Sequence, residues 1–126
     1  MDFREHEAIY LQIAGYVSEH ILTGKWAEEE KIPSVRDLGV TLEVNPNTVM
    51  RAYELLQSQE VIYNKRGLGF FVSPDSRNKI RLLRKERFVQ QELPEVFRNM
   101  ALLEIGMRDI QKEFEKFIAN NKASKK

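Results

Sequence analysis

The chain has 126 residues, enough for one domain or for a small domain with an appendage, and its hydrophobic fraction of 42% suits a packed core and argues against general disorder. It has no cysteine, which excludes disulfides and cysteine metal sites, and its two histidines, His6 and His20, lie too far apart on one predicted helix to share a metal. No apolar run approaches the roughly 20 residues of a membrane span, and the acidic N-terminus is unlike a signal peptide. We therefore expect a cytoplasmic protein without a cofactor.

The net charge of +1 is unevenly distributed along the chain. Residues 1–74 hold 7 Lys/Arg and 11 Asp/Glu, a net of −4, whereas residues 75–126 hold 13 and 8, a net of +5. An acidic N-terminal part can bind nucleic acid only if its few cations gather on one face.

The first predicted helix covers residues 7–23, where apolar side chains recur at helical spacing before Gly24. An acidic run, residues 28–30, is expected in a solvated loop. Ser34, with Asp37 three residues later, resembles a capping box and predicts a short helix over 34–43. Asn45 caps the next helix, and Pro46 occupies its first position, where a missing N–H costs nothing.

This next helix is predicted to have one apolar and one polar face. Two β-prone runs follow, 61–63 and 70–72, with a basic, glycine-containing turn between them that predicts a β-hairpin. Two short helices joined by a tight turn, followed by a hairpin, predict a winged helix-turn-helix. The apolar face consists of Val49, Ala52, Tyr53 and Leu56, and the polar face of Asn47, Thr48 and Arg51.

Pro74 marks a predicted domain boundary. Beyond it the pattern predicts helices near 76–91, 94–104 and 107–119, with an interruption at Leu93-Pro94 and a frayed tail from Asn120. The expected fold is mainly α with a small β-hairpin. A winged helix-turn-helix domain, residues 1–74, precedes a C-terminal helical dimerisation module, residues 75–126.

Four motifs stand in register over residues 9–72. They are Ile9-Tyr10-Leu11-Gln12-Ile13, Pro33-Ser34-Val35-Arg36-Asp37-Leu38, Asn45 to Tyr53, and Arg66-Gly67-x-Gly69-x-Phe71-Val72. In this arrangement the chain resembles GntR-family transcription regulators, and more narrowly their short YtrA-like branch, whose small all-helical dimerisation module the C-terminal helices also resemble. The resemblance implies a bacterial DNA-binding regulator that is not an enzyme.

The chain departs from the family pattern at several positions. Pro46 and Met50 stand where many members have arginine, so base contacts are not carried over to them. Glu29 stands where the family often has a turn glycine, and a positive φ there would cost about 1–2 kcal/mol. Gly39 replaces the usual helical alanine, at a cost of roughly 0.5–1 kcal/mol.

The DNA-binding residues are expected on the first short helix, the polar helix and the hairpin tip. For each of them there is also an alternative in which the side chain does not contact DNA. Arg36 would reach a phosphate or a guanine edge, or pair with a nearby acid. Thr48 would bind a phosphate or its own helix backbone, and Asn47 would read an adenine edge or be solvated. Arg51 would reach a phosphate or pair with Glu54 or Glu43. The predicted DNA-binding set is Arg36, Asn45, Asn47, Thr48, Arg51, Lys65, Arg66 and Gly67.

Other prominent side chains are expected to serve packing. The aromatic residues Trp26, Tyr53, Phe70 and Phe71 are interpreted as core rather than base-stacking residues. The basic run Arg77, Lys79, Arg81, Arg84, Lys85 and Arg87 is interpreted as an exposed helix face rather than a specific DNA contact. A second copy of the chain would bury Leu93, Phe97, Met100, Leu103, Ile110 and Phe114.

The sequence therefore predicts a homodimeric, sequence-specific repressor that acts on a palindromic operator in double-stranded DNA. The alternative is a winged-helix protein–protein docking module that does not bind DNA, because the domain is acidic overall. An enzyme is not expected, since no nucleophile–base set, phosphate-binding glycine loop or metal cluster is apparent. A small-molecule effector is left open, with a pocket near Tyr16, Trp26 or Phe88.

Overall fold

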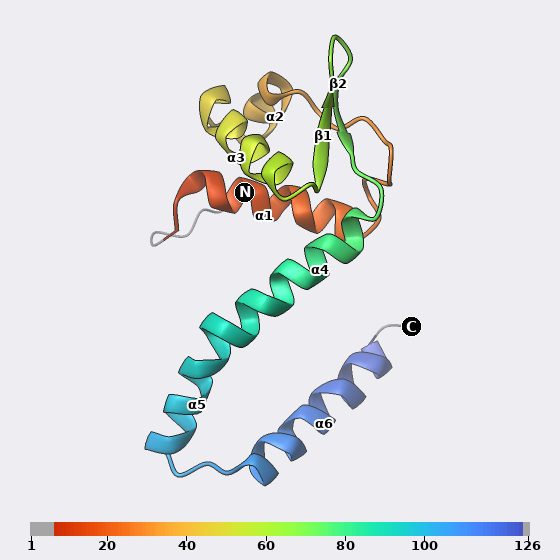
Figure 1. Ribbon diagram of the computed structural model, residues 1–126. Helices are drawn as coiled ribbons and strands as arrows, with labels where there is room; N and C mark the ends of the chain where they lie inside the picture. The colour runs from red at the N-terminus through yellow and green to blue at the C-terminus, as the bar shows by residue number, and fades with distance from the viewer. Residues whose placement is uncertain (1–6, 125–126) are drawn as a thin grey trace. The chain divides into compact units, whose positions relative to one another are not determined.

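The computed structural model describes residues 7–124, and its first three helices form where the sequence predicts them (Figure 1). Helix α1 spans Ile9–Leu22, α2 spans Val35–Leu42 and α3 spans Pro46–Ser58. The Ser34 Oγ accepts the Asp37 N–H at 3.1 Å, and the Asn45 Oδ1 accepts the Asn47 N–H at 2.8 Å. Each oxygen satisfies an amide that the first turn of a helix leaves without a partner, which confirms both predicted caps.

The turn between α2 and α3 passes close to Gly39. Helix α2 ends at Glu43, which is left-handed with φ 57°, and the Val44 N–H then bonds back to the Gly39 carbonyl at 2.9 Å. A Cβ on Gly39 would lie 3.0 Å from the Val44 oxygen and 3.4 Å from the Pro46 Cγ. A side chain at residue 39 would therefore be tightly packed against the turn, whereas the sequence alone indicated only a weaker helix former.

The predicted hairpin is present and carries a third extended segment. Strand β1, Ile62–Lys65, pairs antiparallel with β2, Gly69–Val72. Residues 29–32 then pair with β2: the Glu29 N–H donates to the Val72 oxygen at 2.8 Å, and the Ile32 N–H donates to the Phe70 oxygen at 2.9 Å. Glu29 has φ 66°, so the strain that we considered for this family glycine position is present.

The core lies between α1, α3 and the inner face of the hairpin. Tyr53 is fully buried, and its hydroxyl donates to the Pro33 carbonyl at 2.7 Å. Burial raises the pKa of Tyr53, so this phenol remains a protonated donor. Phe70 packs edge-on against Tyr53 with ring centres 4.9 Å apart. Both are core residues as predicted, whereas Trp26 and Phe71 are only half-buried.

Helix α4, Ser76–Arg87, is anchored to the winged helix by its basic residues. The Arg77 Nη2 donates to the Leu22 carbonyl at 3.0 Å, and the Lys79 Nζ donates to the Glu60 carbonyl at 3.1 Å. Leu22 ends α1, and Glu60 follows the end of α3. Cations are favourable at such carbonyl-rich helix ends, so part of the basic run serves tertiary structure.

The chain forms two compact units, which meet between Arg84 and Lys85. The first unit thus includes the first turns of α4 together with the hairpin and the helices before it. The second unit holds a π-helical turn η1, Phe88–Glu92, then α5, Leu93–Leu102, and α6, Met107–Ser124. No helix among residues 7–124 is long and apolar enough to cross a membrane.

The structure corrects two predictions about the C-terminal helices. We expected Leu93-Pro94 to interrupt the helix. Instead, the Leu93 N–H donates to the Phe88 carbonyl five residues back, and the helix continues through a π-helical turn. This wider turn accommodates Pro94, which has no N–H of its own to donate. Helix α6 also continues to Ser124 rather than ending near residue 119, and residues 125–126 of the expected frayed tail lie outside the described residues.

Candidate nucleic-acid interface

The first turn of α3 presents polar groups to solvent. Asn45 and Asn47 are exposed and Thr48 is half-buried. Asn45 already uses its Oδ1 to cap the helix. The Asn47 and Thr48 side chains have no hydrogen-bond partner among residues 7–124, so the local backbone bond considered for Thr48 is not made. This turn therefore offers free donors and acceptors beside a helix N-terminus, where an anion is favoured.

Arg36 lies in the first turn of α2 and is exposed. No carboxylate in the described part of the chain pairs with its guanidinium. The alternative of a surface arginine held by a nearby acid is thus not realised, and the charge remains available to an external anion.

Arg51 has a partner that the sequence did not suggest. Its guanidinium carbon lies 3.9 Å from the centre of the Tyr10 ring, in a cation–π stack between α3 and α1. We considered ion pairs with Glu54 or Glu43, and neither is formed. The side chain is still exposed, so the stack orients the guanidinium without burying its charge.

The hairpin tip carries the exposed residues Lys65, Arg66 and Gly67. Gly67 has φ 80°, which the turn requires. The Lys65 Nζ lies 4.8 Å from the centre of the Phe71 ring, and Phe71 stacks on Tyr63 at 5.9 Å. In Figure 1 the tip and the first turn of α3 lie toward the same upper side of this domain.

Sequence reasoning missed Lys31, which it left in the connector after the acidic run. The structure pairs Lys31 with Phe71 of β2 in an isolated antiparallel bridge, so its backbone adds to the hairpin. The available signal was Ile32 before Pro33, because the residue before a proline favours extended backbone. Nothing local, however, indicates which strand such a segment joins.

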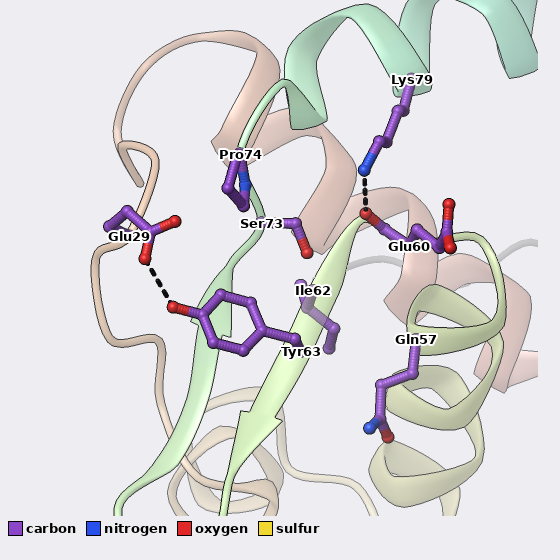
Figure 2. Close-up of a pocket in the computed structure, with 8 residues that line it drawn as sticks. All are labelled: Glu29, Gln57, Glu60, Ile62, Tyr63, Ser73, Pro74 and Lys79. Atoms are coloured by element: carbon purple, nitrogen blue, oxygen red, sulfur yellow. Dashed lines mark hydrogen bonds between the residues drawn. The ribbon is translucent and has the colours of Figure 1, made fainter.

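Figure 2 shows an open hollow of about 470 Å³ on the same domain, near the base of the hairpin. Its polar groups bond one another: the Tyr63 hydroxyl donates to the Glu29 Oε2 at 2.6 Å, and Lys79 reaches the Glu60 carbonyl. The bond to Glu29 raises the pKa of Tyr63. The hollow is lined by Glu29, Gln57, Glu60, Ile62, Tyr63, Ser73, Pro74 and Lys79.

The aromatic region where we considered an effector pocket is filled in part by its own rings. His20 lies 4.2 Å from the Tyr16 ring centre and 4.7 Å from that of Trp26. Among residues 7–124 no group of three or more His, Asp or Glu side chains could hold a metal. His6 lies outside the described residues.

One known protein family matches the part of the sequence that forms these helices and the hairpin. The family model for "Bacterial regulatory proteins, gntR family" matches residues 9–72, which contain α1 to β2. The chain belongs to the gntR family. It is therefore a DNA-binding transcription regulator of the winged-helix type, and the family consists of regulators rather than enzymes.

Relatives of the GntR chain extend the match beyond the winged helix. The HTH-type transcriptional repressor YtrA of Bacillus subtilis is 27% identical over 126 residues, covering 100% of this chain and 96% of YtrA. The regulator YhcF of the same organism is 32% identical over 71 residues, 56% of this chain and 59% of YhcF. These matches confirm the resemblance to the YtrA-like branch.

Solved structures of known regulators are also similar to this chain. A GntR-family transcriptional regulator from Bacteroides thetaiotaomicron is 50% identical with a TM-score of 0.80, covering 90% of this chain and 99% of that one. The DNA-binding domain of AraR, crystallised with operator ORR3, is 29% identical with a TM-score of 0.53, covering 58% of this chain and 88% of that one. The first likeness includes the C-terminal helices, and the second concerns the winged helix.

Proposed function

We propose that this GntR-family chain is a homodimeric repressor that binds a palindromic operator in cytoplasmic double-stranded DNA. The repressor role is supported by the full-length match to YtrA, which is named a repressor. Operator binding is supported by the similarity of the winged helix to the AraR domain in complex with an operator. Cytoplasmic localisation is proposed because that is where bacterial DNA lies.

The observation that carries the proposal is a set of unpaired polar and cationic groups on α2, α3 and the hairpin tip. Arg36, Lys65 and Arg66 are exposed, and no carboxylate in the described part of the chain pairs with them. By contrast, Arg84 of the basic run is bound to Glu19 at 3.2 Å. A domain with a net negative charge thus keeps free cations beside the helix that would enter the major groove.

Each proposed contact has a distinct role. Asn47 would read a base edge through its amide, and Thr48 and the α3 N-terminus would hold a phosphate. Arg36 and Arg51 would flank them, and the hairpin tip would contact the adjacent backbone or minor groove. The proposed DNA-binding set is Arg36, Asn45, Asn47, Thr48, Arg51, Lys65, Arg66 and Gly67.

Dimerisation is proposed because the second unit leaves large apolar side chains exposed. Phe97 is 50% exposed, Leu103 68% and Phe114 61%, and no side chain of α6 is buried over residues 107–122. Such a surface on two amphipathic helices would be covered by the same surface of a second copy, in an isologous contact. Two winged helices joined in this way would read half-sites about one helical turn apart, roughly 34 Å. The proposed interface is Leu93, Phe97, Met100, Leu103, Ile110 and Phe114, of which Met100 is already buried within its own chain.

Selection of bound fragments from a random duplex pool tests this function. We expect an enriched inverted repeat, and Arg36→Ala and Lys65→Ala should weaken binding and flatten its salt dependence. Lys25→Ala, which removes an exposed lysine of the loop after α1, is the matched control. A pool without enrichment would favour the alternative of a protein–protein docking module.

Sedimentation velocity tests the dimer separately. We expect Phe114→Glu to yield monomers, because it places a charge in a contact that excludes water, whereas Lys112→Glu on the same helix should leave the dimer intact. A dimer that survives Phe114→Glu would argue against the proposed interface. Arg36→Ala and Lys65→Ala should leave the sedimentation coefficient unchanged.

A further inference from the structure

The extended segment before α2 places one more lysine on the outer face of the hairpin. Lys31 lies opposite Phe71, and Phe71 lies opposite Tyr63 in the strand pairing. Residues directly opposite in an antiparallel ladder point their side chains to the same face. Lys65, two residues from Tyr63, shares that face, whereas Ile62 and Phe70 alternate to the buried one.

Gly69 leaves room for the Lys31 side chain beside Lys65. It lies opposite Lys65 in the ladder, and a Cβ on Gly69 would be 3.1 Å from the Lys31 Cε and 3.8 Å from its Nζ. The Lys31 side chain therefore crosses the strand over this glycine, next to the position of Lys65. A side chain on residue 69 would displace Lys31, so the glycine serves this crossing as well as its φ of 117°.

No ion pair neutralises either ammonium group among the described residues. Both lysines are exposed, and neither pairs with a carboxylate within residues 7–124. Glu29, which is on the same segment as Lys31, is bound to the Tyr63 hydroxyl. Glu29 thus forms no ion pair with either lysine, so both cations are left to bind an external anion, and DNA phosphates supply such anions.

We propose that Lys31 is a further phosphate-binding residue, which forms with Lys65 a two-lysine clamp on the DNA backbone across Gly69. This inference rests on the proposed DNA-binding function and deepens it. It extends the interface from the hairpin tip to the segment before α2, which the sequence motifs do not include.

The test measures binding of the full chain to a fluorescein-labelled random-sequence duplex about 30 base pairs long, by anisotropy at several salt concentrations. Lys31→Met removes the charge and keeps most of the aliphatic stem over Gly69. We expect the slope of log K against log salt to become shallower by about 0.9 per protomer, as for loss of one phosphate contact. Lys31→Arg should restore the slope.

The matched control is Lys25→Met, which removes a charge from the preceding loop and should leave the slope unchanged. Equal slopes for wild type, Lys31→Met and Lys25→Met would overturn the inference, whereas salt-dependent binding by the wild type would still support the DNA binding on which the proposed function rests. A lower melting temperature for Lys31→Met with an unchanged slope would also overturn it, because the lysine would then act only in packing. Absence of salt-dependent binding by the wild type would instead refute the proposed function and this inference with it.

Discussion

The same substitution at two helical glycines should have opposite effects on stability. Gly15 lies within α1, and a Cβ added there meets nothing within 4 Å apart from its own helix and neighbours. Gly15→Ala should therefore gain the helix propensity of alanine, about 0.5–1 kcal/mol in the free energy of unfolding. Gly39 lies within α2, but there the new methyl group meets backbone.

The magnitude at Gly39 follows from the contacts. The Cβ would lie 3.0 Å from the Val44 oxygen, and the Val44 amide is itself bonded to the Gly39 carbonyl at 2.9 Å. Moving this turn also presses on Pro46, 3.4 Å away, which begins helix α3. Overpacking of this kind costs about 1–3 kcal/mol, which exceeds the propensity gain and leaves a net loss of about 1 kcal/mol.

Urea denaturation followed by far-UV circular dichroism measures both variants, with protein concentration held fixed because association contributes to apparent stability. We expect Gly15→Ala to raise and Gly39→Ala to lower the midpoint, and Gly39→Ala to reduce the melting temperature by roughly 3–6 °C. If Gly39→Ala proved as stable as Gly15→Ala, the turn would be able to relax, and our argument that close packing selects this glycine would be wrong.

Three further predictions concern tyrosines. Tyr53→Phe should lower the free energy of unfolding by about 1–2 kcal/mol, because the Pro33 carbonyl loses its donor. Tyr63→Phe should change the free energy of unfolding by less than about 0.5 kcal/mol, because its hydroxyl is exposed. A larger loss for Tyr63→Phe than for Tyr53→Phe in urea titrations would contradict this. Because burial raises the pKa of Tyr53 above 10.0, the unfolded state loses this proton at a lower pH than the folded state does. Above pH 10 the free energy of unfolding should therefore fall more steeply in wild type than in Tyr53→Phe, by up to about 1.4 kcal/mol per pH unit. Parallel pH profiles of the two proteins would refute this. Tyr10→Leu should weaken duplex binding roughly two- to fivefold, because it removes the ring that orients Arg51. Tyr10→Phe keeps the ring and should preserve the affinity for the duplex. Equal anisotropy titrations of the two variants would count against the idea that Tyr10 positions Arg51.

Local chemistry allowed much of the winged helix to be predicted. Caps and turns depend on residues within a few positions of each other, so the Ser34 and Asn45 caps could be inferred directly. Helical spacing similarly predicted that Tyr53 is buried. The exposure of Asn47 and Lys65 follows from the same periodicities, which is why part of the candidate site could be named in advance.

The π turn before Pro94 shows where local reasoning was incomplete. Proline predicts a break because it lacks an N–H and clashes with the preceding turn. The chain accommodates both effects by widening one helical turn, in which the Leu93 N–H donates to the Phe88 carbonyl. The helix then continues into α5. Whether a helix breaks or widens depends on the packing around it, which sequence periodicity does not contain.

The sequence by itself determined the order of the helices, their caps, the hairpin glycines and the family, because each depends on neighbouring residues or on motif spacing. Only the tertiary structure decided that Lys31 joins the hairpin beside Phe71 and that Arg51 stacks on Tyr10. It also showed that the turn between α2 and α3 leaves little room for a side chain at Gly39. These contacts join segments whose distance is set by how the helices and the hairpin pack together, and no local pattern records that distance.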